Sequence, residues 1–274
     1  MPDFFVYIII ALLIGISSGI LSGIFGVGGA TITIPFMRLF LGVPGKIAIG
    51  TALPTVIPTA ISGFIVHYKK GLVRTKIGLI CGLSGSLSAF FGAWCTKFFE
   101  GNVLMIFTSV FIFITAVRFI LENIKTAKRK NTNLLDDKTK GGQRGEIERK
   151  ENVKFLRIFS IGFMTGFLSG FLGIGGGSIL VPAFVIFLGI SMHEAVATSL
   201  LSIILMAIPG SIEHVLLNNT NIYLFAVITV GAILGSQIGA RLSIKAKERL
   251  LAYLFSIFLI SMSLWLGISE FLNF

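Results

Sequence analysis

Two clusters of glycine, each followed by a hydroxyl residue, have the residue types and spacing of a binding site. The first is Gly26-Val27-Gly28-Gly29, which precedes Thr31, and the second covers residues 173–177, which precede Ser178. Glycine suits a backbone that turns with positive φ or meets another backbone closely. If each cluster leads into a helix, the first amides of that helix lack partners and carry the positive end of its dipole. An anion binds well at such an end, and a nearby hydroxyl adds a donor. We therefore predict an anion site at these two turns.

A second pair of hydroxyl residues lies in the apolar segments that follow. Thr51-Ala52-Leu53 matches Thr198-Ser199-Leu200. Nearby prolines would kink a helix and free carbonyl groups toward a cavity; they are Pro54, Pro58 and Pro209. We expect Thr51 and Thr198 to face that cavity, while the alternative, in which each threonine bonds to its own helix, stays open. The predicted substrate-binding residues are Gly28, Gly29, Thr31, Thr51, Gly175, Gly176, Gly177, Ser178 and Thr198.

Both glycine clusters belong to a stretch that the chain repeats. The stretch at 15–35, GISSGILSGIFGVGGATITIP, returns at 162–182 as GFMTGFLSGFLGIGGGSILVP, and matched residues lie 147 positions apart, as 176 − 29 shows. A nucleotide-binding loop is excluded, because neither cluster continues into Gly-Lys-Ser/Thr or follows a strand–helix pattern. The glycines before each cluster have the small-xxx-small spacing that favours close helix packing; they are Gly15, Gly19, Gly23, Gly162, Gly166 and Gly170.

The composition is that of a multispanning membrane protein. Of the 274 residues, 54% are hydrophobic and 13% are charged, and the mean hydropathy is +0.93. The second apolar segment of each copy is too short to cross a hydrocarbon core of about 30 Å at about 1.5 Å per residue. The apolar segments are 4–25, 30–42, 47–66, 75–96 and 103–121, then 156–172, 178–189, 193–213, 222–240 and 250–269.

Basic residues predict the orientation of these segments. Most Lys and Arg residues fall in loops 69–76 and 241–249 and in the polar segment 125–154. Basic loops stay on the cytoplasmic side, so the net charge of +11 reflects topology and we expect no nucleic-acid partner. Loop 69–76 would then be inside, whereas its equivalent in the second copy, 214–221, would be outside. The two copies would therefore have opposite orientations in the membrane. The rival topology has parallel repeats and would put loop 241–249 outside.

These observations predict an all-α integral membrane protein built from two inverted repeats of five helical elements each. The second element of each repeat is a short half-helix after a Gly-rich break. We divide the chain into a first transmembrane repeat (1–122), a cytoplasmic basic linker (123–154) and a second transmembrane repeat (155–274). The protein would be a multi-pass component of the plasma membrane, with both termini outside.

The remaining reactive side chains give weaker signals. His67 and His214 recur near the end of long apolar segments, where we favour an interfacial position over a proton relay. Cys81 and Cys95 lie within one apolar segment, so we interpret them as structural thiols. The sequence has no His, Cys, Asp or Glu cluster with metal-ligand spacing and no recurring nucleophile–base pair. We therefore expect no catalytic residue, no metal, no other cofactor and no enzymatic activity.

The glycine clusters and their flanks resemble the TauE/SafE, or sulfite exporter, family of membrane transporters. The resemblance rests on GIFGVGGATITIPF and GFLGIGGGSILVPAF, each followed by Ala-x-x-Thr-Ala/Ser-Leu, and on the later segment GSQIGARLS. It spans both copies and leaves out only the linker. Copy one departs from the fuller glycine triplet, with Ala30 where copy two has Gly177.

The resemblance implies transport of a small sulfur-containing anion such as sulfite, a sulfonate or sulfoacetate. Together with the two turns, it predicts a secondary transporter that works by alternating access and uses the proton gradient. Expected partners are the small anionic substrate and the lipid bilayer, and a homo-oligomer is possible. The alternatives are an anion channel or uniporter, a membrane-embedded sulfur or redox protein that uses Cys81 or Cys95, and a scaffold that transports nothing.

Overall fold

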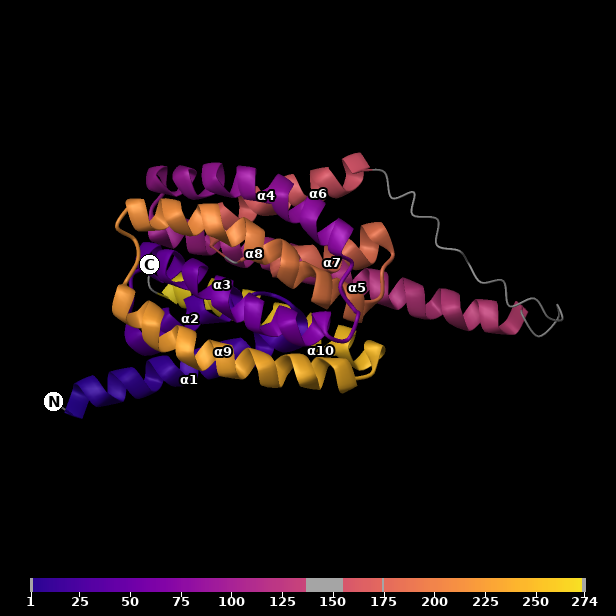
Figure 1. Ribbon diagram of the computed structural model, residues 1–274, viewed down its shortest axis with the longest axis horizontal. Coiled ribbons are helices and arrows are strands. Elements are labelled where there is room, and N and C mark those ends of the chain that lie inside the picture. The colour runs from indigo at the N-terminus through magenta and orange to yellow at the C-terminus, as the bar shows by residue number, and fades with distance from the viewer. Residues whose placement is uncertain (1, 137–154, 174, 273–274) are drawn as a thin grey trace.

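The protein is an all-α bundle, as the sequence predicts. The computed structural model describes residues 2–136, 155–173 and 175–272, and this part of the chain is helical, without strands (Figure 1). The first copy contains α1 Pro2–Phe25, α2 Ala30–Leu41, α3 Gly45–Tyr68, α4 Thr75–Cys95, a 3₁₀ turn at Thr96–Phe98 and α5 Gly101–Asp136. The second contains α6 Phe155–Leu172, α7 Gly177–Leu188, α8 Met192–Leu216, α9 Ile222–Lys245 and α10 Glu248–Leu272.

Eight helices in the described residues are long and apolar enough to cross a membrane, whereas α2 and α7 are shorter. Each short helix has 12 residues, which is about 18 Å of rise. Each starts after a left-handed glycine, Gly29 or Gly176, and ends before another, Gly42 or Gly189. Glycine adopts this conformation readily and other residues do not. These four positions therefore set the length of the half-helices, and the predicted short second elements are confirmed.

Rows of small residues pack helices of one copy against helices of the other. A Cβ at Gly19 of α1 would collide with the carbonyl oxygen of Ala232 in α9. The equivalent Gly166 of α6 stands in the same relation to Gly85 in α4. The glycines one turn to either side of Gly19 and Gly166 also meet the backbone of the same partner helix. The predicted packing role of these glycines is confirmed.

The equivalent helices α3 and α8 cross antiparallel at the centre of the bundle. A Cβ at Gly63 of α3 would lie 3.2 Å from Leu200 of α8, and one at Gly210 of α8 would lie 2.8 Å from Leu53 of α3. Residue numbers therefore rise in one helix as they fall in the other. This relation between equivalent helices is the one that inverted repeats require. The orientation of the copies relative to a membrane stays a prediction.

The basic loops of the two copies lie at one end of the bundle. Arg74, in the loop before α4, pairs with Glu194 at the start of α8 at 3.0 Å. His193, next to Glu194, has its Nε2 3.1 Å from the carbonyl oxygen of Ser243 near the end of α9. At the opposite end, Thr220, in the loop before α9, donates to a carbonyl near the start of α3 at 2.8 Å. One end of the bundle is therefore joined by charged groups and the other by neutral hydrogen bonds.

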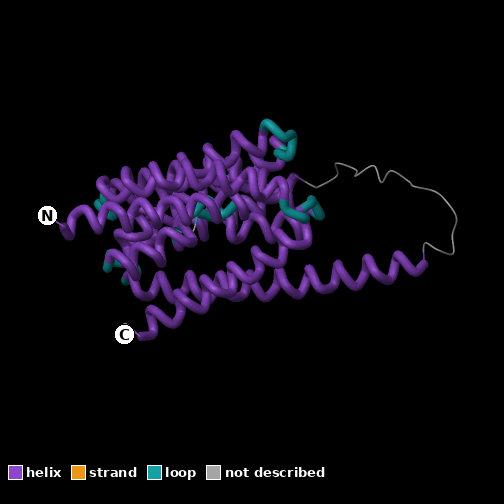
Figure 2. The backbone as a smooth tube through the Cα atoms, turned by 90° about the horizontal axis from the view of Figure 1, so that it is seen from below, coloured by secondary structure: helices purple, strands orange, loops and turns teal. Residues whose placement is uncertain are grey.

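Helices α5 and α10 pack together along one side of the bundle, and α5 projects beyond it (Figure 2). Phe119 of α5 and Phe255 of α10 meet edge to face with ring centroids 5.3 Å apart. The predicted linker, 123–154, begins inside α5, because that helix continues to Asp136. The rest of the predicted linker, 137–154, lies outside the described residues. The start of α1 and the end of α10 lie away from the end at which α5 leaves the bundle (Figure 1).

Candidate functional site

Two glycine-rich turns, here called tip 1 (residues 26–29) and tip 2 (residues 173 and 175–177), form the candidate site. Three glycines in each tip have a left-handed backbone, which Gly adopts without the strain that a Cβ would bring. Their φ angles are 69° at Gly26, 79° at Gly28, 90° at Gly29, 68° at Gly173, 71° at Gly175 and 75° at Gly176. The tips thus share one conformation, and the predicted turn in each copy is confirmed.

The two tips touch each other beside the middle of α3. A Cβ at Gly177 would collide with the backbone of Val27, and one at Gly175 would lie 3.4 Å from the carbonyl oxygen of Val27. Val56, in the middle of α3, lies 2.8 Å from the Cβ position of Gly28 and 3.2 Å from that of Gly175. The structure therefore brings the predicted glycines of both copies together halfway along a helix long enough to span a membrane.

Each half-helix begins directly at its tip. The carbonyl of Gly29 accepts hydrogen bonds from the amides of Ile32 and Thr33, both at 3.0 Å. The carbonyl of Gly176 accepts from the amide of Leu180 at 2.8 Å in the same way. The amides before these first intrahelical hydrogen bonds have no acceptor within their own helix. With the helix dipole, they make each tip a positively polarised end that favours an anion.

The predicted hydroxyl residues Thr31 and Ser178 lie in the first turns of the half-helices. Each is only 1% exposed. The hydroxyl of Ser178 has no hydrogen-bond partner. A buried hydroxyl without a partner is unfavourable, and a bound ligand could supply the missing acceptor.

Thr51 and Thr198 are placed differently from the tip residues. Thr51 Oγ1 accepts from the backbone amide of Asn221 at 2.9 Å, and Thr198 Oγ1 accepts from that of Arg74 at 3.0 Å. Asn221 and Arg74 are equivalent residues that immediately precede α9 and α4. Each threonine thus holds the start of a helix in the other copy. The structure places these two hydroxyls at contacts between copies and not at the tips.

Three serines near the tips were not expected from the sequence. Ser199 of α8 donates to the carbonyl of Gly26 at 2.9 Å and so fixes tip 1 against α8. Ser22 of α1 and Ser169 of α6 lie behind the two tips, and neither hydroxyl has a partner. Their recurrence with the 147-residue spacing, each four residues before the first glycine of a tip, is the pattern that could have revealed them.

Comparison with known proteins identifies the family. Residues 11–266 match the family model described as sulfite exporter TauE/SafE. This chain belongs to the TauE/SafE family. Probable membrane transporter protein YdhB of Bacillus subtilis (strain 168) is 30% identical over 223 residues, which cover 81% of this chain and 85% of YdhB. YunE of the same organism, also a probable membrane transporter protein, is 28% identical over 261 residues, or 92% and 94% of the two chains.

The family extends to a more distant relative. Probable membrane transporter protein MJ0441 of Methanocaldococcus jannaschii is 24% identical over 280 residues, which cover 96% of this chain and 97% of MJ0441. No solved structure matches the chain significantly. With the family match and eight candidate spans in the described residues, the chain is a multi-pass membrane transporter of the TauE/SafE family.

The repeated histidines of this TauE/SafE protein are buried. His67 and His214 are 0% and 1% exposed, and Nε2 of each lies 3.4 Å from a carbonyl oxygen, that of Gly23 or Gly170. Nδ1 of each ring has no hydrogen-bond partner. Each histidine lies in the last turn of its own helix, α3 or α8, and packs against the last turn of α1 or α6 just before a tip. Its predicted interfacial position in the membrane stays a prediction.

The two cysteines of the TauE/SafE chain are free thiols, and they differ in exposure. Cys81 is buried in α4, where its carbonyl faces Gly162 of α6, and Cys95 is half-buried at the end of α4. Among the described residues, no group of three or more His, Cys, Asp or Glu side chains is placed to hold a metal ion.

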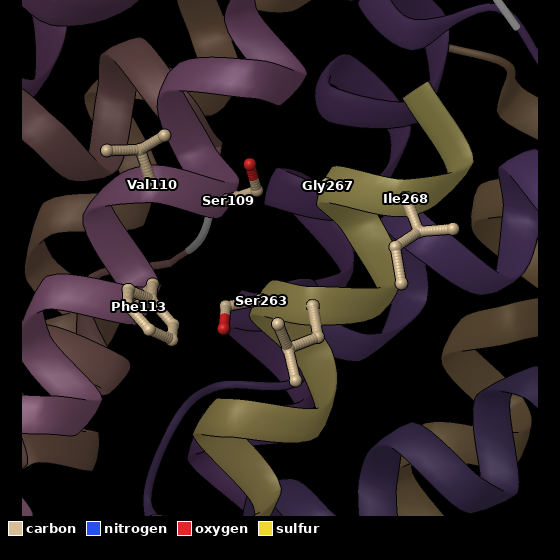
Figure 3. A pocket seen from close by; sticks show the side chains of 7 residues that line it. Ser109, Val110, Phe113, Ser263, Gly267 and Ile268 are labelled. Atoms are coloured by element: carbon tan, nitrogen blue, oxygen red, sulfur yellow. The ribbon is translucent and has the colours of Figure 1, made fainter. Parts of the chain in front are cut away.

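A separate pocket of about 470 Å³ opens between α5 and α10 (Figure 3). It is lined by Ser109, Val110, Phe113, Ser263, Leu264, Gly267 and Ile268. Both serine hydroxyls already donate within their own helices, Ser109 to Ile106 at 2.8 Å and Ser263 to Ile260 at 2.9 Å. The pocket is therefore largely apolar, offers an anion no free hydroxyl donor, and contains none of the predicted site residues.

Proposed function

We propose that this TauE/SafE protein is a secondary transporter that moves a small sulfur-containing anion across the plasma membrane by alternating access. The substrate class is sulfite, a sulfonate or a sulfoacetate-like anion, and the proton gradient supplies the driving force. The observation that carries the proposal is the meeting of two half-helix N-termini beside the middle of α3. Such ends of broken helices bind anionic groups in transporters built from inverted repeats.

The chemistry of the tips supports an anionic substrate. Backbone amides at the start of α2 and α7 are donors, and the hydroxyl of Ser178 adds another. A donor-rich, buried site favours oxyanions, whose oxygens accept several hydrogen bonds, over cations, which would need acceptors. The description of the matching family as sulfite exporters favours sulfur oxyanions within this class.

The contacts at the two ends of the bundle support alternating access. The Arg74–Glu194 pair joins the copies at one end, and the bond from Asn221 to Thr51 joins them at the other. Opening the site to either side would require contacts at one end to separate while those at the opposite end stay closed. We assign the end with Arg74 to the cytoplasm, together with the linker, because it gathers the basic loops.

Proton coupling needs a group inside the protein that can bind a proton. His67 and His214 are buried, occur in both copies, and each keeps one ring nitrogen without a partner. Ionisable groups in membrane-spanning helices often mark ion pathways. These two histidines are our candidates for carrying the coupled proton.

Flux measurements with purified protein in liposomes test the proposal. We expect saturable uptake of radiolabelled sulfate or sulfoacetate that competes with unlabelled sulfite and changes rate when a pH gradient is imposed. Preloading the liposomes with the same anion should accelerate uptake, because an alternating carrier exchanges faster than it returns empty. No flux above that of protein-free liposomes would contradict transport, and non-saturating flux without acceleration by preloading would indicate a channel.

A further inference from the structure

Two serines behind the tips have hydroxyls that the protein itself does not use. Ser22 is 0% exposed and Ser169 is 1% exposed, and the Oγ of each has no hydrogen-bond partner. Serines inside helices usually donate to a carbonyl three or four residues earlier. Ser18, one turn before Ser22, does so to Gly15 at 3.0 Å, and Ser88 of α4 does so to Gly85 at 3.1 Å. Ser22 and Ser169 lack such a bond, as do four other buried hydroxyls of the described helices, Ser178, Ser211, Thr229 and Ser243. Of these six, only Ser22 and Ser169 are equivalent positions of the two copies.

This unpaired hydroxyl occurs at the same position in both copies. Ser22 and Ser169 are equivalent under the 147-residue shift, and equivalent residues, Ser18 and Thr165, lie beside them at the two tips. An unpaired hydroxyl in one copy could arise by chance from local packing. The same unpaired hydroxyl at equivalent positions of both copies indicates a requirement shared by both, because a buried polar atom without a partner is unfavourable.

Both serines lie beside the start of a half-helix. The Cβ position of Gly29, the residue before α2, lies 3.7 Å from Cβ of Ser22. The Cβ position of Gly176, the residue before α7, lies 3.4 Å from Oγ of Ser169. Each helix N-terminus thus has an unpartnered, buried hydroxyl beside it, and α7 also has the free hydroxyl of Ser178 in its first turn. A side chain at Gly29 would therefore lie next to Ser22, and one at Gly176 would lie next to Ser169.

We propose that Ser22 and Ser169 donate their hydroxyl hydrogens to the transported oxyanion, one from each copy, and so complete the site formed by the first amides of α2 and α7. This inference rests on the proposed function. A tetrahedral or pyramidal oxyanion such as sulfate or sulfite has enough acceptor oxygens to satisfy both hydroxyls and the amides. Binding would then supply the partners that the protein lacks.

Binding titrations of the purified full chain with sulfate and with sulfite test the inference. Ser22→Ala and Ser169→Ala should each raise Kd about tenfold, which is the size expected for one hydrogen bond to a charged ligand. The double variant should lose roughly the product of the two effects if both serines contact one anion. Ser18→Ala is the matched control, because its hydroxyl is already bonded to Gly15, and its Kd should equal that of the wild type.

Unfolding temperatures without anion separate ligand binding from a structural role. Removing a hydroxyl that has no partner should leave the unfolding temperature of Ser22→Ala and Ser169→Ala unchanged or slightly higher. If both variants bind the anion with the Kd of the wild type, the proposed role of the serines is overturned and the proposed function still stands. Failure of the wild type to bind any of the anions would overturn both. A lower unfolding temperature with an unchanged Kd would show that the serines are structural.

Discussion

Glycines do two different things in this protein. Those of the small-xxx-small rows allow backbones to touch, as Gly19 does against Ala232, whereas those of the tips adopt left-handed conformations, as Gly29 does with φ of 90°. The sequence predicts both roles, because regular four-residue spacing and a tight cluster are different patterns. It does not reveal that the hydroxyls of Ser22 and Ser169 are unpaired, since that depends on which neighbours fold against them.

The packing role predicts a sharp difference between two helical glycines. In Gly19→Ala the added methyl would meet the carbonyl of Ala232, so α1 and α9 must separate, at a cost of about 1–3 kcal/mol in free energy of unfolding. In Gly267→Ala the nearest atom lies 3.6 Å away, at an ordinary contact distance, and stability should stay equal or rise. Thermal unfolding of the purified variants measures the difference, and equal stability of the two would contradict the packing role.

At the scale of elements, the short helices could be predicted but the end of α5 could not. Apolar segments of about a dozen residues bounded by glycine identify α2 and α7 directly. By contrast, α5 continues to Asp136, well beyond the apolar segment that ends near 121. Hydropathy marks where a helix leaves the hydrocarbon core, and a polar sequence can remain helical beyond that point.

The starts of α9 and α4 depend on a threonine from the other copy. In Thr51→Val the amide of Asn221 loses its acceptor while the side-chain shape is kept, so the free energy of unfolding should fall by about 1–3 kcal/mol. Thr198→Val should have a similar effect through the amide of Arg74. Thr51→Ser keeps the hydroxyl and is the matched control. If thermal unfolding shows Thr51→Val to be as stable as Thr51→Ser, the hydrogen bond does not hold α9.

For the whole molecule, the sequence repeat and the loop charges predict much of the arrangement. The shift of 147 residues pairs every helix of one copy with one of the other, and the contacts of Gly63 and Gly210 place α3 and α8 antiparallel. Which helix packs on which could not be predicted, because a row of small residues fits any similar row. The pairing of α1 with α9 and of α6 with α4 depends on how the two copies interlock.

The proposed orientation predicts opposite accessibility of two loops. In a variant with Cys81 and Cys95 replaced by Ala, Lys70→Cys should resist a membrane-impermeant thiol reagent in intact cells, whereas Asn218→Cys should react. Both positions are exposed, at opposite ends of the bundle. Permeabilised cells provide the control, in which both cysteines should react. Labelling of Lys70→Cys but not of Asn218→Cys in intact cells would reverse the orientation, and labelling of both would contradict the inverted topology.

The central claim is that an anion binds where the two tips meet. The controls for it lie in the same half-helices, because Gly42 and Gly189 have left-handed backbones like Gly29 and Gly176, with φ of 61° and 63°. Apart from the adjacent residues, nothing in the described part of the chain lies within 4 Å of a Cβ at Gly42 or Gly189. Alanine at any of the four positions therefore adds backbone strain, but alanine at a tip also fills the space beside Ser22 or Ser169.

The most direct test is the unfolding temperature of the purified protein with and without sulfite, sulfate, sulfoacetate or taurine. A bound ligand stabilises the folded state in proportion to its occupancy. We expect at least one of these ligands to raise the unfolding temperature of the wild type, Gly42→Ala and Gly189→Ala, and to have little effect on Gly29→Ala and Gly176→Ala. No rise in the wild type with any of them, or an equal rise in the tip variants, would contradict an anion site at the tips.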